Sequence, residues 1–202
     1  MIFSFDVISD LHLTAETSFN YEGRPTSLFC IIAGNISDDM IVLHNTIKQL
    51  SHLYQGLFFI DGQIENDPLI DRNFRLSELN TISNGYKNTV FLHNNVVVLD
   101  GIAIVGINGW YTSIDSLSPD DQFQTRAYKY EDLMYLEKTI EKLQLHPDVK
   151  KIIVVSSSVP DTELYYGEVP NLVDSTPLNY CIGRDTESKI VKWVFGSYEK
   201  IV

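Results

Sequence analysis

Short, continuously apolar runs alternate along this chain with longer amphipathic segments, and each run stops at a loop of small or polar residues. The clearest run is Leu28–Ala33, which stops at Gly34 and Asn35. Runs of this kind are typical of strands that are buried on both faces, as in parallel sheets. Their alternation with helical segments predicts an α/β fold.

The other runs and segments define the expected elements. Strands are expected at Ile2–Ile8, Leu28–Ala33, Leu57–Ile60, Val96–Leu99, Ile102–Ile107, Ile152–Val155 and Lys189–Phe195, and helices at Asp38–Tyr54, Leu69–Ile82 and Tyr130–Leu145. We expect Gly56 to end the first helix. Asp100 and Gly101 predict a tight hairpin, because both residues tolerate positive φ. No repeat and no linker rich in Gly, Pro or Ser interrupts the sequence, so we expect one domain over residues 1–202.

The charge balance excludes some classes of partner. Fifteen basic and 27 acidic residues give a net charge of −12, which disfavours binding to nucleic acid and to anionic lipid. No apolar stretch approaches the roughly 18 to 20 residues of a membrane span, and the first residues do not form a signal peptide. Two cysteines, Cys30 and Cys181, cannot build a disulfide framework. We therefore expect a cytoplasmic protein, in the host cytoplasm or the virion if it is viral.

The loops at the strand ends carry the candidate functional residues. In open α/β sheets, ligands collect beyond the carboxyl ends of the strands. The loops in question are Ser9–His12, Gly34–Asn35, Gly62–Gln63, Ser156–Ser158 and Gly196–Glu199. We expect these five loops to converge on one site.

In their order and spacing, these loops resemble the motifs of the calcineurin-like metallophosphoesterases, especially the small bacterial and phage members. That family has Asp-x-His after the first strand, Gly-Asp after the second and Gly-Asn-His-(Asp/Glu) after the third. Ser9-Asp10-Leu11-His12 matches the first motif, while Gly34-Asn35 and Gly62-Gln63-Ile64-Glu65 stand at the next two. Val154–Pro160 and Val194–Lys200 resemble the two later motifs without their histidines. The resemblance covers Ile2 to Lys200 and implies an αββα sandwich.

The substitutions within these motifs bear on the chemistry. The family hydrolyses phosphoesters with two metal ions, which a carboxylate bridges and several imidazoles hold. By resemblance, Asp10 and His12 would serve one metal and Asn35 stands where the bridging aspartate is expected. An amide is neutral and coordinates only through its oxygen. Gln63 offers only an amide oxygen, Ile64 replaces the catalytic histidine, and serines replace later imidazoles at Ser157, Ser158 and Ser197.

The expected outcome is a degenerate site. Of the five histidines, only His12 lies in a motif. We expect no catalytic residue, no two-metal centre and no cofactor. The expected remnant of the family's site consists of Asp10, His12, Asn35, Gln63, Ser157, Ser197 and Glu199.

These observations favour a catalytically inactive metallophosphoesterase-like protein, a pseudoenzyme that acts as a binding or scaffold subunit through a protein partner or self-association. Aromatic residues in loop-like stretches, Trp110-Tyr111 and Tyr165-Tyr166, suit such a contact role. The alternative is a divergent phosphoesterase that uses one divalent metal such as manganese, held by Asp10, His12 and Glu199. A third hypothesis, a pocket that binds a nucleotide or phosphate without hydrolysis, is disfavoured by the acidic charge.

The end of the sequence leaves two interpretations open. The family's chains continue through further strands after the last motif, whereas three residues follow Glu199 here. Either the second sheet is short of strands, which leaves Lys189–Phe195 as an edge that invites pairing with another chain, or the 202 residues belong to a longer product or assembly.

Overall fold

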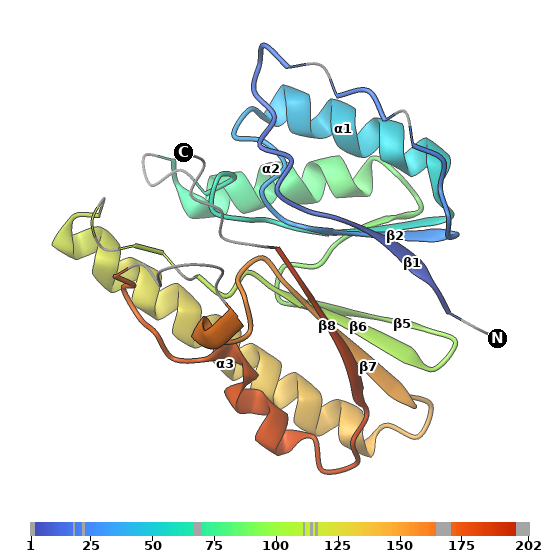
Figure 1. The fold of residues 1–202 in the computed structure, drawn as a ribbon, viewed down its shortest axis with the longest axis vertical. Coiled ribbons are helices and arrows are strands. Elements are labelled where there is room, and N and C mark those ends of the chain that lie inside the picture. The colour runs from blue at the N-terminus through green and yellow to red at the C-terminus, as the bar shows by residue number, and fades with distance from the viewer. Residues whose placement is uncertain are drawn as a thin grey trace. The chain divides into compact units, whose positions relative to one another are not determined.

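The structure, a computed structural model, describes residues 3–17, 19–21, 23–66, 70–110, 112–113, 115, 117–164 and 171–196. It divides the chain into two units, Met1–Leu92 and His93–Val202, and each unit contains one four-stranded sheet (Figure 1). In the first unit the elements are β1 (Phe5–Ile8), β2 (Phe29–Ala33), α1 (Met40–Leu53), β3 (Gly56–Ile60), α2 (Arg72–Asn84) and β4 (Thr89–Phe91). In the second unit they are β5 (Asn95–Leu99), β6 (Ile102–Ile107), α3 (Pro119–Leu145), β7 (Lys151–Ser156), η2 (Thr162–Leu164), η3 (Leu178–Arg184) and β8 (Ile190–Phe195).

The sheet of the N-terminal unit is parallel, in the order β1-β2-β3-β4, and α1 and α2 lie along the same face of it (Figure 1). Cys30, Ile32, Leu57 and Phe59 point to that face and pack against both helices. The continuous apolar runs of β2 and β3 are buried almost throughout, as parallel strands require. The carboxyl ends of β1, β2 and β3 therefore lie along one edge of this sheet.

One boundary in this unit differs from the prediction. We expected Gly56 to end the first helix, but α1 ends at Leu53 and Gly56 is the first residue of β3, paired with Phe29. A Cβ on Gly56 would lie 2.7 Å from Cδ1 of Phe29. The glycine is therefore needed for a close approach between two strands rather than for a helix end.

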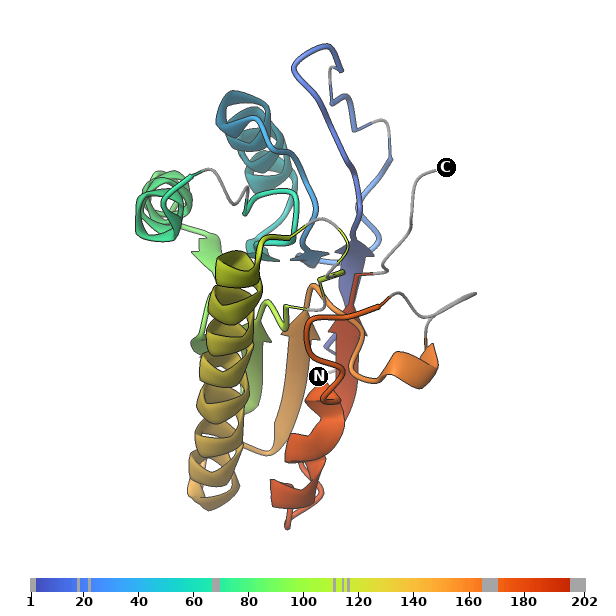
Figure 2. The same cartoon turned by 90° about the vertical axis from the view of Figure 1, so that its left-hand side faces the viewer.

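The sheet of the C-terminal unit has the order β5-β6-β7-β8, with an antiparallel hairpin followed by two parallel pairings. The hairpin prediction is confirmed, because Asp100 and Gly101 have φ of 48° and 80°. Helix α3 runs along the sheet, with η3 beside it (Figure 2). The core of the unit joins the sheet to Leu136, Ile140 and Leu143 of α3.

Helix α3 is longer than the sequence pattern predicts. We expected it to begin near Tyr130, but it begins at Pro119, where the Oγ of Ser118 accepts the N–H of Asp121 at 3.2 Å. A proline at the first helical position and acidic residues in the first turn are ordinary start signals. The apolar periodicity hides this start, because the buried residues of the helix before Leu133, which are Thr125, Lys129 and Asp132, are polar.

The α/β fold class is confirmed, and each unit supplies one sheet and its helices, as an αββα sandwich requires. The expectation of one domain over residues 1–202 stays a prediction. Strand β8 lies at one edge of its sheet among the described residues. A search of the described helices finds none with the length and apolarity to cross a bilayer.

Candidate functional site: hydrogen-bonded strand ends

The residues of the first two predicted motifs have an uncommon backbone conformation. Asp10, His12 and Asn35 have φ of 54°, 46° and 57°, in the left-handed region that few non-glycine residues adopt. The loop after β1 lies beside the loop after β2, because the N–H of Asp10 donates to Gly34 O and that of His12 to Asn35 O, at 3.2 and 3.0 Å. Conformations of this kind persist where the surrounding contacts hold them, commonly at functional sites.

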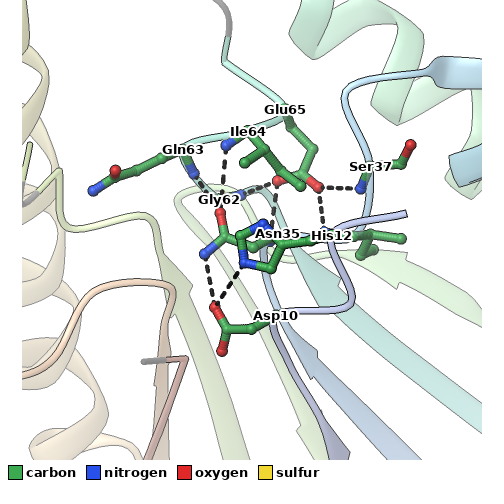
Figure 3. A network of polar contacts seen from close by, with 9 residues as sticks. Asp10, His12, Asn35, Ser37, Gly62, Gln63, Ile64 and Glu65 are labelled. Atoms are coloured by element: carbon green, nitrogen blue, oxygen red, sulfur yellow. Dashed lines mark hydrogen bonds and ion pairs between the residues drawn. The ribbon is translucent and has the colours of Figure 1, made fainter. Parts of the chain in front are cut away.

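The side chain of Asn35 uses both ends of its amide (Figure 3). Its Nδ2 donates to Oδ1 of Asp10 at 2.9 Å, and its Oδ1 accepts the N–H groups of Gln63 and Ile64 at 2.9 and 3.3 Å. Asn35 is only 8% exposed, so these bonds are shielded from water. The amide thus joins three strand-end loops by hydrogen bonds alone.

A buried glutamate holds the loop after β2 and the loop after β3 together. The carboxylate of Glu65, which is 0% exposed, accepts the backbone N–H groups of Asn35, Ile36, Ser37 and Gly62 at 2.5 to 3.1 Å. Burial raises the pKa of Glu65 from 4.5 to about 7, while the N–H donors act to lower it. The sequence contains the signal for this residue, since Glu65 occupies the last position of the third motif, but we assigned it no role.

The loop after β3 approaches the loop after β2 very closely. A Cβ on Gly62 would lie 2.3 Å from Oδ1 and 2.4 Å from the backbone nitrogen of Asn35. Because such contacts do not occur between real atoms, glycine is required at this position. Glu65 and Gly62 together fix the geometry that lets Asn35 reach Gln63.

His12 and Asp10 are the two motif residues whose side chains suit a metal ion. The Nε2 of His12 is 3.9 Å from Oδ1 of Asp10 and has no hydrogen-bond partner among the described residues. Two ligands of one metal, each about 2.1 Å from it, are separated by a comparable distance. The Gln63 side chain extends away from both of them (Figure 3).

These residues do not fit a two-metal centre of the kind that the resemblance in sequence implies. The position expected to bridge two ions is a neutral amide whose oxygen already accepts two N–H groups. Within the described part of the chain, no three His, Cys, Asp or Glu side chains are grouped so that they could hold a metal ion. Among the described residues, this arrangement cross-links the loops and brings Asp10 and His12 together as a pair that a single ion could use.

Four of the predicted site residues, Ser157, Ser158, Ser197 and Glu199, belong to the C-terminal unit. Ser157 and Ser158 follow β7 and are buried, and the neighbouring Ser156 Oγ accepts the Nε1–H of Trp193 at 2.8 Å. Ser197 and Glu199 lie outside the described residues, so their place in the site is untested. The convergence of all five loops stays a prediction.

One predicted contact residue is not on the surface. Trp110 is 6% exposed and packs against Tyr128 with ring centroids 5.2 Å apart. Its aromatic ring belongs to the interior, because the strand-end loop after β6 folds inward. Tyr111, Tyr165 and Tyr166 lie outside the described residues.

A second buried carboxylate, in the C-terminal unit, was missed by the sequence analysis. Asp132 on α3 is 0% exposed and accepts the N–H groups of Asn108 and Gly109 at 3.1 and 2.9 Å. Nδ2 of Asn94 donates to the same carboxylate at 2.9 Å. Asp132 lies inside the helix that we expected from Tyr130 onward, but its partners Asn94, Asn108 and Gly109 are far from it in sequence, so the sequence analysis gave it no role.

Comparison with known proteins places the fold. No family model matches the sequence, and no curated protein matches it. Among solved structures, the phosphopantetheinyl hydrolase (PptH) from Mycobacterium tuberculosis is similar, with a TM-score of 0.63 and 17% identity, over 98% of this chain and 83% of that chain. A likeness at this identity concerns the fold. The chain therefore has the α/β fold of a known hydrolase.

Proposed function

We propose that this chain is a pseudoenzyme of the metallophosphoesterase type, which binds a protein partner and does not hydrolyse phosphoesters. The Asn35 amide carries the proposal, because it occupies the expected bridging position and its hydrogen bonds to Asp10, Gln63 and Ile64 need no metal. The hydrolase-like fold supports the metallophosphoesterase part of the proposal.

The binding part rests on surface chemistry. A net charge of −12 favours a basic or mixed-charge protein partner and steers its approach. Strand β8, at an edge of the described sheet, offers backbone groups to a further strand. These features support assembly with a protein partner or with a second copy.

The experiment compares wild type with Asn35→Asp, which restores the carboxylate. Manganese binding is measured by calorimetry, and hydrolysis of bis(p-nitrophenyl) phosphate is followed in manganese. For wild type we expect neither stoichiometric metal nor turnover. Asn35→Asp replaces the hydrogen bond from the Asn35 amide to Asp10 by two neighbouring carboxylates that repel each other. Without metal, we therefore expect the free energy of unfolding in urea to be about 1 to 3 kcal/mol lower than that of wild type.

A second candidate, hydrolysis with one divalent metal, is favoured by the unpartnered Nε2 of His12 at 3.9 Å from Asp10. In that case Asp10 and His12, with Glu199 as third ligand, would hold the ion. One manganese per wild-type chain, lost in both Asp10→Asn and His12→Gln and accompanied by turnover, would establish this alternative and refute the pseudoenzyme.

A further inference from the structure

The first half of α3 buries polar residues. Thr125, Lys129 and Asp132 face the interior of the C-terminal unit, and both Lys129 and Asp132 are 0% exposed. Nζ of Lys129 donates to the carbonyl oxygen of Asp174 at 2.7 Å. These inward hydrogen bonds hold α3 against the loop after β6 and the segment near Asp174, beside the packing of Trp110 against Tyr128.

The opposite face of the same half is apolar. Phe123 and Tyr130 are 74% and 64% exposed, Ala127 is exposed and Met134 is half-buried. With about 100° per residue, these four positions lie roughly 140° to 200° around the helix from Thr125, on the side opposite the inward polar residues. We name Phe123, Ala127, Tyr130 and Met134 the outward stripe.

An ordinary surface helix has the reverse arrangement, with apolar residues inward and polar residues outward. The residues of the outward stripe follow one another at intervals of four, three and four residues. This is the spacing of the contact residues where one helix packs against another in coiled coils and helix-in-groove complexes. Exposed aromatic residues are also the commonest anchors of protein interfaces. The stripe therefore has the chemistry of a contact surface.

We propose that the outward stripe is the docking site for an amphipathic helix of a partner protein, whose apolar face is flanked by lysine or arginine. Asp120 and Glu131 are exposed on the same half of α3, and the whole chain carries −12. A basic helix complements this charge, whereas a second copy would bring another −12 against it. This inference deepens the proposed binding function and rests on it, but it does not depend on the loss of hydrolysis.

The test uses a synthetic peptide of roughly 20 residues, long enough to form a helix, with leucines at the four-three spacing and lysines beside them. Fluorescence anisotropy measures its binding at low salt. We expect the double variant Phe123→Gln/Tyr130→Gln to bind this peptide with a Kd at least tenfold higher than that of wild type. We also expect wild type to bind a second peptide, with glutamates in place of the lysines, with a Kd at least tenfold higher. Phe74→Gln, at another exposed aromatic residue on α2 (59%), is the matched control and should bind as wild type does.

The proposal would be overturned if the lysine peptide did not bind measurably, or if the double variant bound it as tightly as wild type. It would also be overturned if wild type were a dimer that Phe123→Gln/Tyr130→Gln converts to a monomer, because the stripe would then bind a second copy of this chain. Failure of the proposed function is read separately: wild-type turnover in manganese refutes the pseudoenzyme whatever the peptide does, and a native partner retained equally by wild type and the double variant preserves the binding function but refutes this surface.

Discussion

Asparagine and aspartate have nearly the same shape, yet they make opposite demands on their surroundings. A carboxylate in the position of Asn35 would be acceptor-only, and beside Asp10 it would need a cation between the two. The amide instead donates to Asp10 and accepts from the next loop. A change of one functional group thus lets hydrogen bonds hold a site where two charges would otherwise repel.

The closeness of Gly62 to Asn35 leads to a stability prediction. Gly62→Ala places a methyl group 2.3 Å from Oδ1 of Asn35, so the two loops must separate. We expect a loss of about 1 to 3 kcal/mol in the free energy of unfolding in urea. Gly183→Ala is the control, because its Cβ would meet nothing within 4 Å, and it should change stability by no more than about 0.5 kcal/mol. Equal effects of the two substitutions would contradict the close approach.

Glu65 leads to a prediction about pH. Because burial raises its pKa from 4.5 to about 7, the folded protein holds the Glu65 proton more tightly than the unfolded chain. The contribution of Glu65 to stability is then fully present below about pH 4.5 and is lost as the pH rises to about 7, by on the order of 3 kcal/mol.

Urea unfolding of wild type and Glu65→Gln between pH 4.5 and 8 tests this. The glutamine keeps one acceptor oxygen but directs an NH₂ group at backbone donors, so we expect it to cost about 2 to 3 kcal/mol at pH 5. The difference between the two proteins should narrow as the pH rises. A difference that widens would show that the four N–H donors outweigh burial.

At this scale the sequence identified positions better than roles. The motif order located Asp10, His12, Asn35 and Gln63, and the structure brings the first three together with the backbone of Gln63. The roles of Gly62 and Glu65 depend on distances between loops that are far apart in sequence. Such distances have no local sequence signature.

How well the bounds of a helix could be predicted depended on whether the residues on its buried face are apolar or polar. The bounds of helix α1 were predicted to within two residues because its inward residues, such as Leu43, Ile47 and Leu50, are apolar. The first half of α3 was missed because its inward residues are polar. Strand β4, with three residues, is too short for any periodicity to show. Apolar periodicity in the sequence indicates a helix face that packs by hydrophobic burial. It cannot indicate a face that is held by hydrogen bonds between polar residues.

The start of α1 gives an element-scale prediction with a matched pair. Oδ1 of Asp39 accepts the N–H groups of Ile41 and Val42 at 2.8 and 3.1 Å, whereas Asp38 is an exposed carboxylate one residue earlier. Asp39→Ala and Asp38→Ala remove the same charge. We expect Asp39→Ala to cost about 1 kcal/mol more in thermal or urea unfolding, because only it removes the N-cap. Equal losses would mean that charge at the helix start matters and capping does not.

For the molecule as a whole, the alternation of apolar runs and amphipathic segments predicted the α/β class, and the structural neighbour agrees with it. The division into the units Met1–Leu92 and His93–Val202 was not predicted. No Gly-, Pro- or Ser-rich linker marks the boundary, since the chain passes from β4 to β5 within a few ordered residues. Composition can reveal a flexible linker, but a short ordered connection carries no such signal.

The two sheets also differ in how soon along the chain their strands find partners, and this bears on the order of folding. Strands β5 and β6 are joined by the Asp100-Gly101 turn, whereas every pairing of the N-terminal sheet requires a crossover. Local pairings close quickly and parallel ones slowly. Gly101→Ala, at φ 80°, should therefore slow refolding of the C-terminal unit several-fold in stopped-flow measurements. An unchanged refolding rate would refute an early hairpin.

During synthesis the N-terminal unit, whose strands pair more slowly, leaves the ribosome first. The nascent chain therefore exposes unpaired apolar strands for longer than a protein that began with a hairpin would.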